Sequence, residues 1–305
     1  QGADAVNAKA IIKFAEDVRG DKENPAIVIK NFPVDAVESL LAPPTNPKDF
    51  STNPAEKTGK KGYVTEWSLE AFNTLCGLSP TQAKDMQGGN RYHRVVPQKG
   101  MEQSPTNAGS QLFPWHTEAL YREKNDMYIM LAGLRNQKTP TMILPIEQIE
   151  NIFRGEFTAP EIEMMQKPIY KHIPDKSFNA DEMAFTRPML KCGSGGKFLE
   201  MNIIQNLQRV EIDKAAAKEH GVNVEQAQKL IEKVSGALST INQGVVLGHG
   251  DLLVFDNLRN FHSRTVIHPE DRIKGKERHL MRTQSYRDAV VEEKINNELG
   301  GAFRQ

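Results

Sequence analysis

Apolar residues recur along this chain at two spacings, which predict a mixture of helices and short strands. Helical spacing is clearest in residues 224–241, where apolar side chains recur every three or four positions behind a capping Asn223. Residues 8–18 show the same period and predict a second helix. Ser79 followed by Pro80 is typical of a helix start, so we expect a third helix to begin there.

Short apolar runs, bounded by turn-forming residues, predict the strands. They occupy residues 26–29, 127–134, 141–144, 252–255 and 278–286. We expect residues 145–244 to form a long, mainly helical insertion between the third and fourth of these strands. Strands at both ends of one insertion favour a single α+β domain over residues 1–305, with a β-sandwich or barrel at its centre and helices packed on one face.

Composition and charge narrow the possible functions. The 305 residues include 39 basic and 39 acidic ones, and this balance argues against nucleic acid and anionic membranes as partners. The longest apolar run, residues 127–134, is far shorter than the roughly 20 residues that span a bilayer. Cys76 and Cys192 are too few for a disulfide scaffold, so we expect a cytoplasmic protein that acts on a small molecule.

Histidine and acidic residues suggest a metal centre. In an extended segment, residues two apart point the same way, so His116 and Glu118 can present an imidazole and a carboxylate to one point. Such a pair often arises by chance, and a third ligand is needed. His262, which follows a predicted strand, is the first candidate and His268 the second. Two histidines and one carboxylate suit non-haem Fe(II), which then keeps open positions for oxygen chemistry.

Two arginines follow the distal histidine. Arg278 and Arg282 lie in the last predicted strand, where residues four apart share a face. A guanidinium group is permanently charged and binds a carboxylate through two parallel hydrogen bonds. Both arginines on one face beside a metal therefore predict a site for a dicarboxylate co-substrate.

These segments resemble the Fe(II)- and 2-oxoglutarate-dependent oxygenases of the clavaminate synthase-like type, a group within the taurine dioxygenase-like superfamily that includes hydroxylases of free amino acids. The resemblance is carried by His116-Thr117-Glu118, by the segment from Gly250-Asp251 to Asp256-Asn257, by His262-Ser263-Arg264 and by residues 277–282. Residues 26–33 are similar to the N-terminal strand of that group. The resemblance implies a double-stranded β-helix, or jelly-roll, core with flanking helices and a lid within residues 145–244.

The same resemblance implies roles for individual residues. The expected Fe(II) ligands, and hence the catalytic residues, are His116, Glu118 and His262. The co-substrate 2-oxoglutarate is expected to bind through Arg278, with Arg282 nearby or in its place, and through the hydroxyl of Thr141, with Thr139 as the alternative. The implied reaction uses O2 to hydroxylate an unactivated C–H bond and converts 2-oxoglutarate to succinate and CO2.

The expected substrate is a free amino acid or a small metabolite derived from one, bound under a mobile lid formed by residues 43–61 and 193–196. Candidate contacts for its polar groups are Gln103, Ser110 and Glu200. Two other classes stay open, namely a zinc hydrolase, since zinc accepts the same ligands, and a jelly-roll binding protein without catalysis. A requirement for 2-oxoglutarate and O2 distinguishes the oxygenase from both.

Overall fold

The computed structural model describes residues 2–19, 26–40, 62–81, 90–123, 127–174 and 184–288. The α-helices in these ranges are α1 (Gly2–Arg19), α3 (Val64–Leu75), α4 (Ile146–Glu156), α5 (Ala159–Met165), α6 (Lys214–Glu219) and α7 (Val224–Ser239). Three short 3-10 helices are η1 (Val37–Ser39), η4 (Leu207–Arg209) and η5 (Pro269–Arg272).

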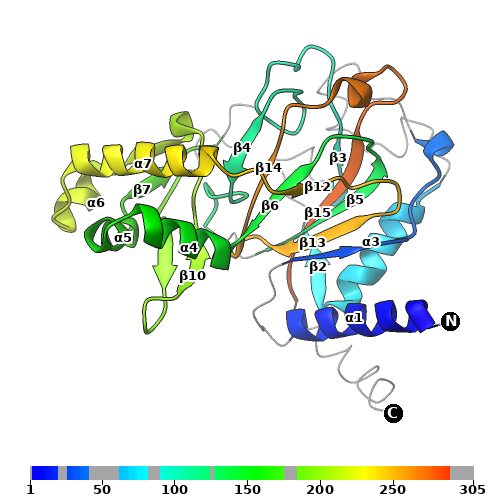
Figure 1. Cartoon of the computed structure of the whole chain (residues 1–305), viewed down its shortest axis with the longest axis horizontal. Coiled ribbons are helices and arrows are strands. Elements are labelled where there is room, and N and C mark those ends of the chain that lie inside the picture. Colours follow the sequence, from blue (N-terminus) through cyan, green and yellow to red (C-terminus); the bar gives the residue numbers. More distant parts are fainter. Residues whose placement is uncertain are drawn as a thin grey trace.

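Two antiparallel sheets form the centre of the molecule (Figure 1). The large sheet has the order β1 (Ala26–Ile29), β13 (Leu252–Asp256), β5 (Tyr128–Arg135), β15 (His279–Arg287) and β2 (Leu78–Pro80), and β3 (His93–Val95) also pairs with β15. The small sheet has the order β12 (Gly244–Val245), β6 (Thr141–Pro145), β14 (Asn260–Arg264) and β4 (Phe113–His116). Strands from both halves of the chain thus lie side by side in each sheet.

The segment between β6 and β12 contains helices α4 to α7 and five further strands. A three-stranded sheet has the order β11 (Val210–Ile212), β7 (Tyr170–His172) and β8 (Phe185–Arg187), and β9 (Leu190–Cys192) pairs with β10 (Phe198–Met201). In Figure 1 this part lies on the left, beside the small sheet. The sequence predicted a mainly helical segment, because strands of three or four residues are too short for a period of two to stand out.

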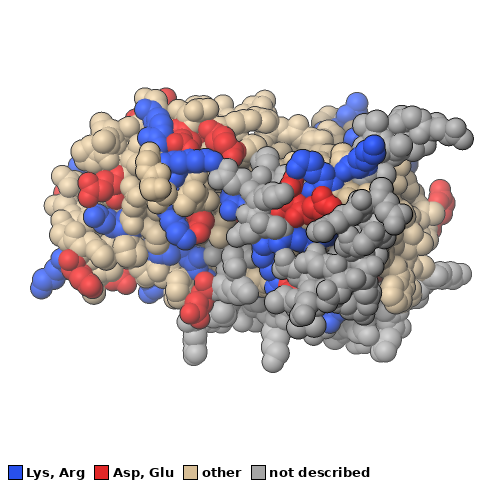
Figure 2. All heavy atoms as spheres, turned by 90° about the horizontal axis from the view of Figure 1, so that it is seen from below, with Lys and Arg blue, Asp and Glu red and all other residues tan. Residues whose placement is uncertain are grey.

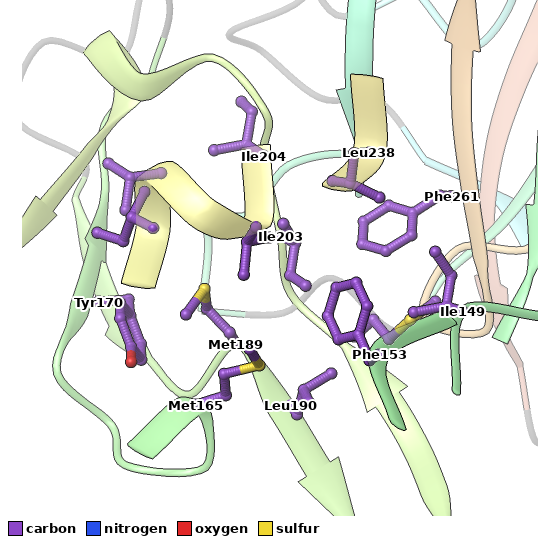
Figure 3. Packing of buried hydrophobic residues seen from close by; sticks show 14 of the residues in the cluster. Ile149, Phe153, Met165, Tyr170, Met189, Leu190, Ile203, Ile204, Leu238 and Phe261 are labelled. Atoms are coloured by element: carbon purple, nitrogen blue, oxygen red, sulfur yellow. The ribbon is translucent and has the colours of Figure 1, made fainter. Parts of the chain in front are cut away.

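Apolar clusters cover the outer faces of both sheets. Phe14 of α1 and Phe72 of α3 share a cluster with Met130 of β5 in the large sheet. Phe153 of α4 shares another cluster with Phe261 of β14 in the small sheet (Figure 3). The expectation of helices on one face is therefore wrong, because each sheet has an apolar outer face and a different set of helices buries each one.

Most of the predicted elements are confirmed, including the mixed α+β class. Strands β1, β5, β6, β13 and β15 begin and end within one residue of the predicted runs, and α7 is capped by Asn223, whose side chain accepts a hydrogen bond from the backbone N–H of Gln226. The helix predicted to begin at Ser79 is wrong. Ser79 and Pro80 lie in β2 at the edge of the large sheet, where proline is tolerated since its missing N–H interrupts no further strand. Residues 43–61 lie outside the described residues.

The distribution of charged side chains on the surface agrees with the equal numbers of basic and acidic residues. Figure 2 shows acidic and basic side chains interspersed over the described part of one face. Within the described ranges, no helix is both long and apolar enough to span a membrane.

Candidate metal centre and active site

The small sheet presents one histidine and one glutamate from a single segment. His116 is the last residue of β4, and Glu118 follows two residues later, where the chain enters a turn. Their side chains point the same way, and His116 Nε2 lies 3.6 Å from Glu118 Oε2. Both side chains are buried.

A second histidine reaches the same point from the neighbouring strand. His262 of β14 is paired directly with His116 of β4, so the two rings lie side by side with centroids 4.1 Å apart. His262 Nε2 lies 3.5 Å from Glu118 Oε2. One ligand atom from each of the three residues falls within 4.8 Å of the others. Cross-strand pairing therefore brings together three residues that are separated by nearly half of the chain.

Neighbouring groups fix the orientation of these ligands. His116 Nδ1 lies 2.7 Å from the carbonyl oxygen of Pro114, which can only accept, so Nδ1 donates the hydrogen and the lone pair of Nε2 is free to bind a metal. Asn257 holds the backbone of Glu118 on both sides. Its Oδ1 accepts from the Glu118 N–H at 2.8 Å, and its Nδ2 donates to the Glu118 carbonyl at 3.1 Å.

The electrostatics keep the centre in the form that binds a metal. Burial raises the pKa of the Glu118 carboxyl, but the guanidinium of Arg282 and the two imidazoles outweigh burial and lower it well below its usual range. Burial, followed by the charge of His116, lowers the pKa of His262 to about 4. At neutral pH the carboxylate is thus ionised and His262 is neutral, as metal coordination requires.

The donor set fits a divalent transition metal. Two imidazoles and one carboxylate, all buried and with the Nε2 of His116 unpartnered among the described residues, match the ligands of a non-haem Fe(II) centre. Zinc accepts the same donors. The geometry at these three residues therefore supports a metal site, and the groups around it distinguish the possible chemistries.

A partly open cavity lies between the two sheets next to His262. The large sheet contributes Ile129 and Leu131 of β5 to its wall, and the small sheet contributes Thr141 of β6. Arg278, which directly precedes β15, and Arg282 of β15 both line it. A cationic cavity beside the metal ligands suits an anionic co-substrate.

The two arginines have different partners. Arg278 Nη2 donates to the hydroxyl of Thr141 at 3.0 Å, and burial lowers the pKa of Arg278 to about 10, which leaves it charged at neutral pH. Arg282 Nη1 donates to Glu118 Oε2 at 3.2 Å, and its Nη2 lies 3.3 Å from Nδ1 of His93. Arg282 therefore faces the metal ligands, whereas Arg278 faces the cavity together with a threonine.

The hydroxyl of Thr139, the alternative to Thr141, makes other hydrogen bonds. Thr139 donates its hydroxyl hydrogen to Asp271 Oδ2 at 2.6 Å and accepts from the backbone N–H of His268 at 3.0 Å. Its hydroxyl is thus occupied within the turn before β6. The other candidate for the distal histidine, His268, is exposed and its ring caps η5 by accepting from the N–H of Glu270.

The three predicted substrate contacts are not among the residues that line the cavity. Gln103 accepts from the side chain of Gln111, and Ser110 contacts Glu102 and Ile267 through its backbone. Glu200 pairs with Lys191 at 2.6 Å in the β9–β10 hairpin. Residues 193–196 form the turn of that hairpin, where Arg154 of α4 donates to the carbonyl of Gly196. None of these groups is part of the cavity wall among the described residues.

The sequence analysis gave no individual role to three residues around the centre. Arg264 lines the cavity and donates to the carbonyls of Thr106 and Gln111. Its position two residues after His262 in a strand was a usable signal, because such residues share a face. Asn257 and His93 act through partners distant in sequence, and no local spacing indicates them.

Comparison with known proteins agrees with this site. No family model matches the chain. Clavaminate synthase 2 from Streptomyces clavuligerus is 24% identical over 306 residues, covering 92% of this chain and 78% of the relative. L-asparagine oxygenase from Streptomyces coelicolor is 24% identical over 259 residues (85% and 70%), and L-lysine 3-hydroxylase from Catenulispora acidiphila is 25% identical over 287 residues (90% and 71%).

The sequence is similar to the clavaminate synthase-like oxygenases. This confirms the resemblance that the sequence motifs indicate. The similarity to clavaminate synthase 2 extends over most of the chain and is not confined to the motifs around the metal ligands.

Solved structures show a likeness in the fold. Asparagine oxygenase in complex with Fe(II), 2S,3S-3-hydroxyasparagine and succinate has a TM-score of 0.67 at 22% identity, covering 90% of this chain and 78% of that one. The non-haem iron oxygenase OrfP in complex with Fe and alpha-ketoglutaric acid has a TM-score of 0.68 at 20% identity, covering 94% and 82%. The fold is therefore shared with non-haem iron oxygenases.

Proposed function

We propose that this protein is an Fe(II)- and 2-oxoglutarate-dependent oxygenase that hydroxylates a free amino acid or a small metabolite derived from one. The observation that carries the proposal is the meeting of His116, Glu118 and His262 with the Arg278–Thr141 pair in one buried region. Oxidation coupled to a dicarboxylate co-substrate requires a metal site with three protein ligands and, beside it, a cationic site that binds a carboxylate. The amino-acid class rests on relatives such as L-asparagine oxygenase and L-lysine 3-hydroxylase.

The metal is assigned to His116, Glu118 and His262. When bound, iron supplies the redox chemistry, in which O2 is consumed, 2-oxoglutarate becomes succinate and CO2, and one oxygen atom enters the substrate C–H bond. The chain supplies geometry and charge. Pro114 fixes the His116 tautomer, Asn257 holds the backbone of Glu118, and the neighbouring imidazoles and Arg282 keep the carboxylate ionised.

The distal carboxylate of 2-oxoglutarate is assigned to Arg278 and Thr141. Arg278 donates one N–H to the Thr141 hydroxyl, and both residues line the cavity. Thr139 is unsuited, since Asp271 and His268 occupy its hydroxyl. Arg282 is the weaker candidate because one of its N–H groups already pairs with Glu118. Burial of the Arg278 site strengthens a charge-assisted contact relative to the same contact in water.

The fold assignment follows the same reasoning. We propose one oxygenase domain over residues 1–305, in which the two sheets form a jelly-roll core and residues 145–244 form an insertion with a lid. The position of the cavity between the two antiparallel sheets supports this assignment. A cytoplasmic location is part of the proposal, and Cys76 and Cys192 are both free thiols.

Succinate release tests the proposed reaction. The purified protein is reconstituted anaerobically with Fe(II), supplied with 2-oxoglutarate and air, and screened against free amino acids and the same residues embedded in peptides. We expect O2-dependent succinate formation with at least one free amino acid and a product 16 mass units heavier, the mass of one oxygen atom. Turnover that needs Zn(II) but neither O2 nor 2-oxoglutarate would establish a hydrolase instead. Iron binding without any turnover on the panel would favour a binding protein.

A further inference from the structure

Strand β4 contains an extra residue just before His116. Against β14, His116 pairs with His262 and Phe113 pairs with Arg264, so three steps along β4 correspond to two steps along β14. An extra residue of this kind is a β-bulge, which redirects a side chain. In a regular strand Phe113 and His116 would face opposite sides, because their positions differ by three. The bulge brings the two side chains to the same side.

The insertion holds the bulge from the other edge of β4. The backbone N–H of Trp115, within the bulge, donates to the side-chain Oε1 of Gln205 at 3.1 Å, and the backbone N–H of Gln205 donates to the Trp115 carbonyl at 2.8 Å. The side-chain Nε2 of Gln205 donates to the carbonyl of Ser235 at 3.2 Å and to the hydroxyl of Ser239 at 2.8 Å, both in α7. Both backbone polar groups of Trp115 are therefore paired, which stabilises the irregular backbone.

The ring of Phe113 lies against the ring of His116. Their centroids are 4.1 Å apart and their planes are inclined by 32°. Rings that met edge to edge could not approach so closely, so the phenyl face covers the imidazole. The ring of His116 also contacts that of His262, and Phe255 lies 5.0 Å from His262. Each imidazole thus contacts the other one and one phenyl ring.

The two phenylalanines have different surroundings. Phe255 is fully buried and belongs to an apolar cluster, so packing alone accounts for its position. Phe113 is half-buried, lines the cavity and belongs to none of the apolar clusters in the described part of the chain. Core packing therefore does not explain why a bulge turns Phe113 onto His116.

Charge gives a reason for this contact. The face of a phenyl ring carries a partial negative charge. A metal ion withdraws electron density from an imidazole that coordinates it and leaves the imidazole partly positive. The attraction between the two rings is then stronger in the metal-bound form, as for a cation above an aromatic face. A phenyl ring on His116 stabilises the metal-bound state over the metal-free one.

We propose that Phe113 is a positioning residue, which holds the imidazole of His116 in the plane needed for coordination and raises the affinity of the site for a divalent metal. The inference rests on the proposed function and deepens it, because the metal is assigned to His116, Glu118 and His262. The hydrogen bond from His116 Nδ1 to Pro114 determines which nitrogen faces the metal. The contact with Phe113 restrains the rotation of the ring that this single hydrogen bond leaves open.

Substitutions at Phe113 test the proposal, with Co(II) as the probe and the metal-free protein as the starting material. Phe113→Leu keeps an apolar side chain without a ring, and we expect it to raise the Kd for Co(II) about three- to tenfold. Phe113→Tyr keeps the ring face and should leave the Kd within about twofold of the wild-type value. The visible absorption bands of Co(II), which depend on the arrangement of its ligands, should shift in Phe113→Leu and stay in place in Phe113→Tyr.

Phe32→Leu is the matched control. The ring of Phe32 also contacts another aromatic ring, edge to face with Phe72 at 6.2 Å, but this pair lies in the outer cluster of the large sheet. Phe32→Leu is expected to lower the Tm of the metal-free protein, since it removes core packing, and to leave the Kd and the spectrum of Co(II) unchanged. Phe113→Leu should lower the metal-free Tm less. If Phe113→Leu does not fold, Phe113→Met replaces it.

The outcomes separate this inference from the proposed function. A raised Kd in Phe113→Leu that Phe113→Tyr restores, in a protein that forms no succinate, supports the positioning role and contradicts the oxygenase. Succinate formation by the wild type, with the same Co(II) Kd in Phe113→Leu, overturns the positioning role alone. Equal rises in Phe113→Leu and Phe113→Tyr, or an equal rise in Phe32→Leu, would indicate a general packing effect and also overturn it. A wild-type protein that binds neither Co(II) nor Fe(II) overturns both proposals.

Discussion

Arg278 donates a hydrogen bond to the hydroxyl of Thr141 across 3.0 Å, and both side chains line the cavity between the sheets. This contact leaves further N–H groups of the guanidinium available for a ligand, among them the buried and unpaired Nε. It joins the residue that precedes β15 to the first residue of β6, and these two points are distant in sequence.

The first prediction concerns this pair. Arg278→Ala is expected to raise the KM for 2-oxoglutarate by roughly 30- to 1000-fold, because a charge-assisted bidentate contact contributes about 2–4 kcal/mol. The KM for the amino acid should change far less. Steady-state succinate formation at varied 2-oxoglutarate concentrations provides the measurement. Should Arg282→Ala produce the larger rise and Arg278→Ala a mild one, the carboxylate site belongs to Arg282.

The second prediction concerns the metal ligands. His262→Ala is expected to abolish turnover and to weaken Fe(II) binding, since one of three ligands is lost. His268→Ala serves as the control, because that ring is exposed and caps η5. Iron content after anaerobic reconstitution and succinate release are measured side by side. Full activity of His262→Ala, with loss of activity in His268→Ala, would reverse the assignment.

The third prediction concerns the turn before β6. Asp271 accepts hydrogen bonds from the N–H groups of Gln137, Lys138 and Thr139 and from the Thr139 hydroxyl, and its own carbonyl accepts from the N–H of Arg278. Asp271→Ala leaves these donors unpaired, and we expect a loss of about 2–4 kcal/mol in the free energy of unfolding. The KM for 2-oxoglutarate should rise as well, because the turn leads directly into β6, which carries Thr141, the proposed co-substrate contact.

A matched control separates stability from positioning. Asp213→Ala removes a cap that accepts two N–H groups at the start of α6, in the insertion. It should lower stability with no change in the KM for 2-oxoglutarate. Equal KM changes in the two variants would show that the turn has no positioning role.

The fourth prediction concerns pH. Burial, followed by the charges of Arg187 and Arg209, lowers the pKa of His172 to about 3, against 6.5 in the unfolded chain. As the pH falls below 6.5, the unfolded state binds a proton that the folded state rejects, so the protein loses about 1.4 kcal/mol of stability per pH unit through this group. His172→Phe should reduce the slope between pH 6 and pH 4. Urea unfolding of both proteins at several pH values measures it, and identical slopes would contradict the prediction.

The strands could be predicted from sequence where the apolar run was long enough to be recognised. Strand β5 is buried on both faces and reads as a continuous apolar run. Strands β7 to β11 are only three or four residues long and carry no such signal. Strand β2 was mistaken for a helix start, because a serine followed by proline suits both a helix cap and the edge of a sheet.

The candidate site likewise has residues that short sequence motifs indicate and residues that they do not. His116, Glu118 and His262 were found because short motifs indicated them, and the structure brings them together. Pairing between strands decides which other side chains surround them. The approach of His93 to Arg282 depends on the register of β3 against β15, which spacing within either strand does not encode.

The pleat of the small sheet links the metal ligands to the core of the insertion. Trp115 and Phe261 belong to the cluster that contains Phe153, while their sequence neighbours His116 and His262 face the opposite side. Adding or deleting one residue within β14 would therefore exchange the two faces, turning an imidazole into the apolar core and a phenyl ring toward the proposed metal site. The length of this strand thus meets two demands at once, one from packing and one from the proposed metal coordination.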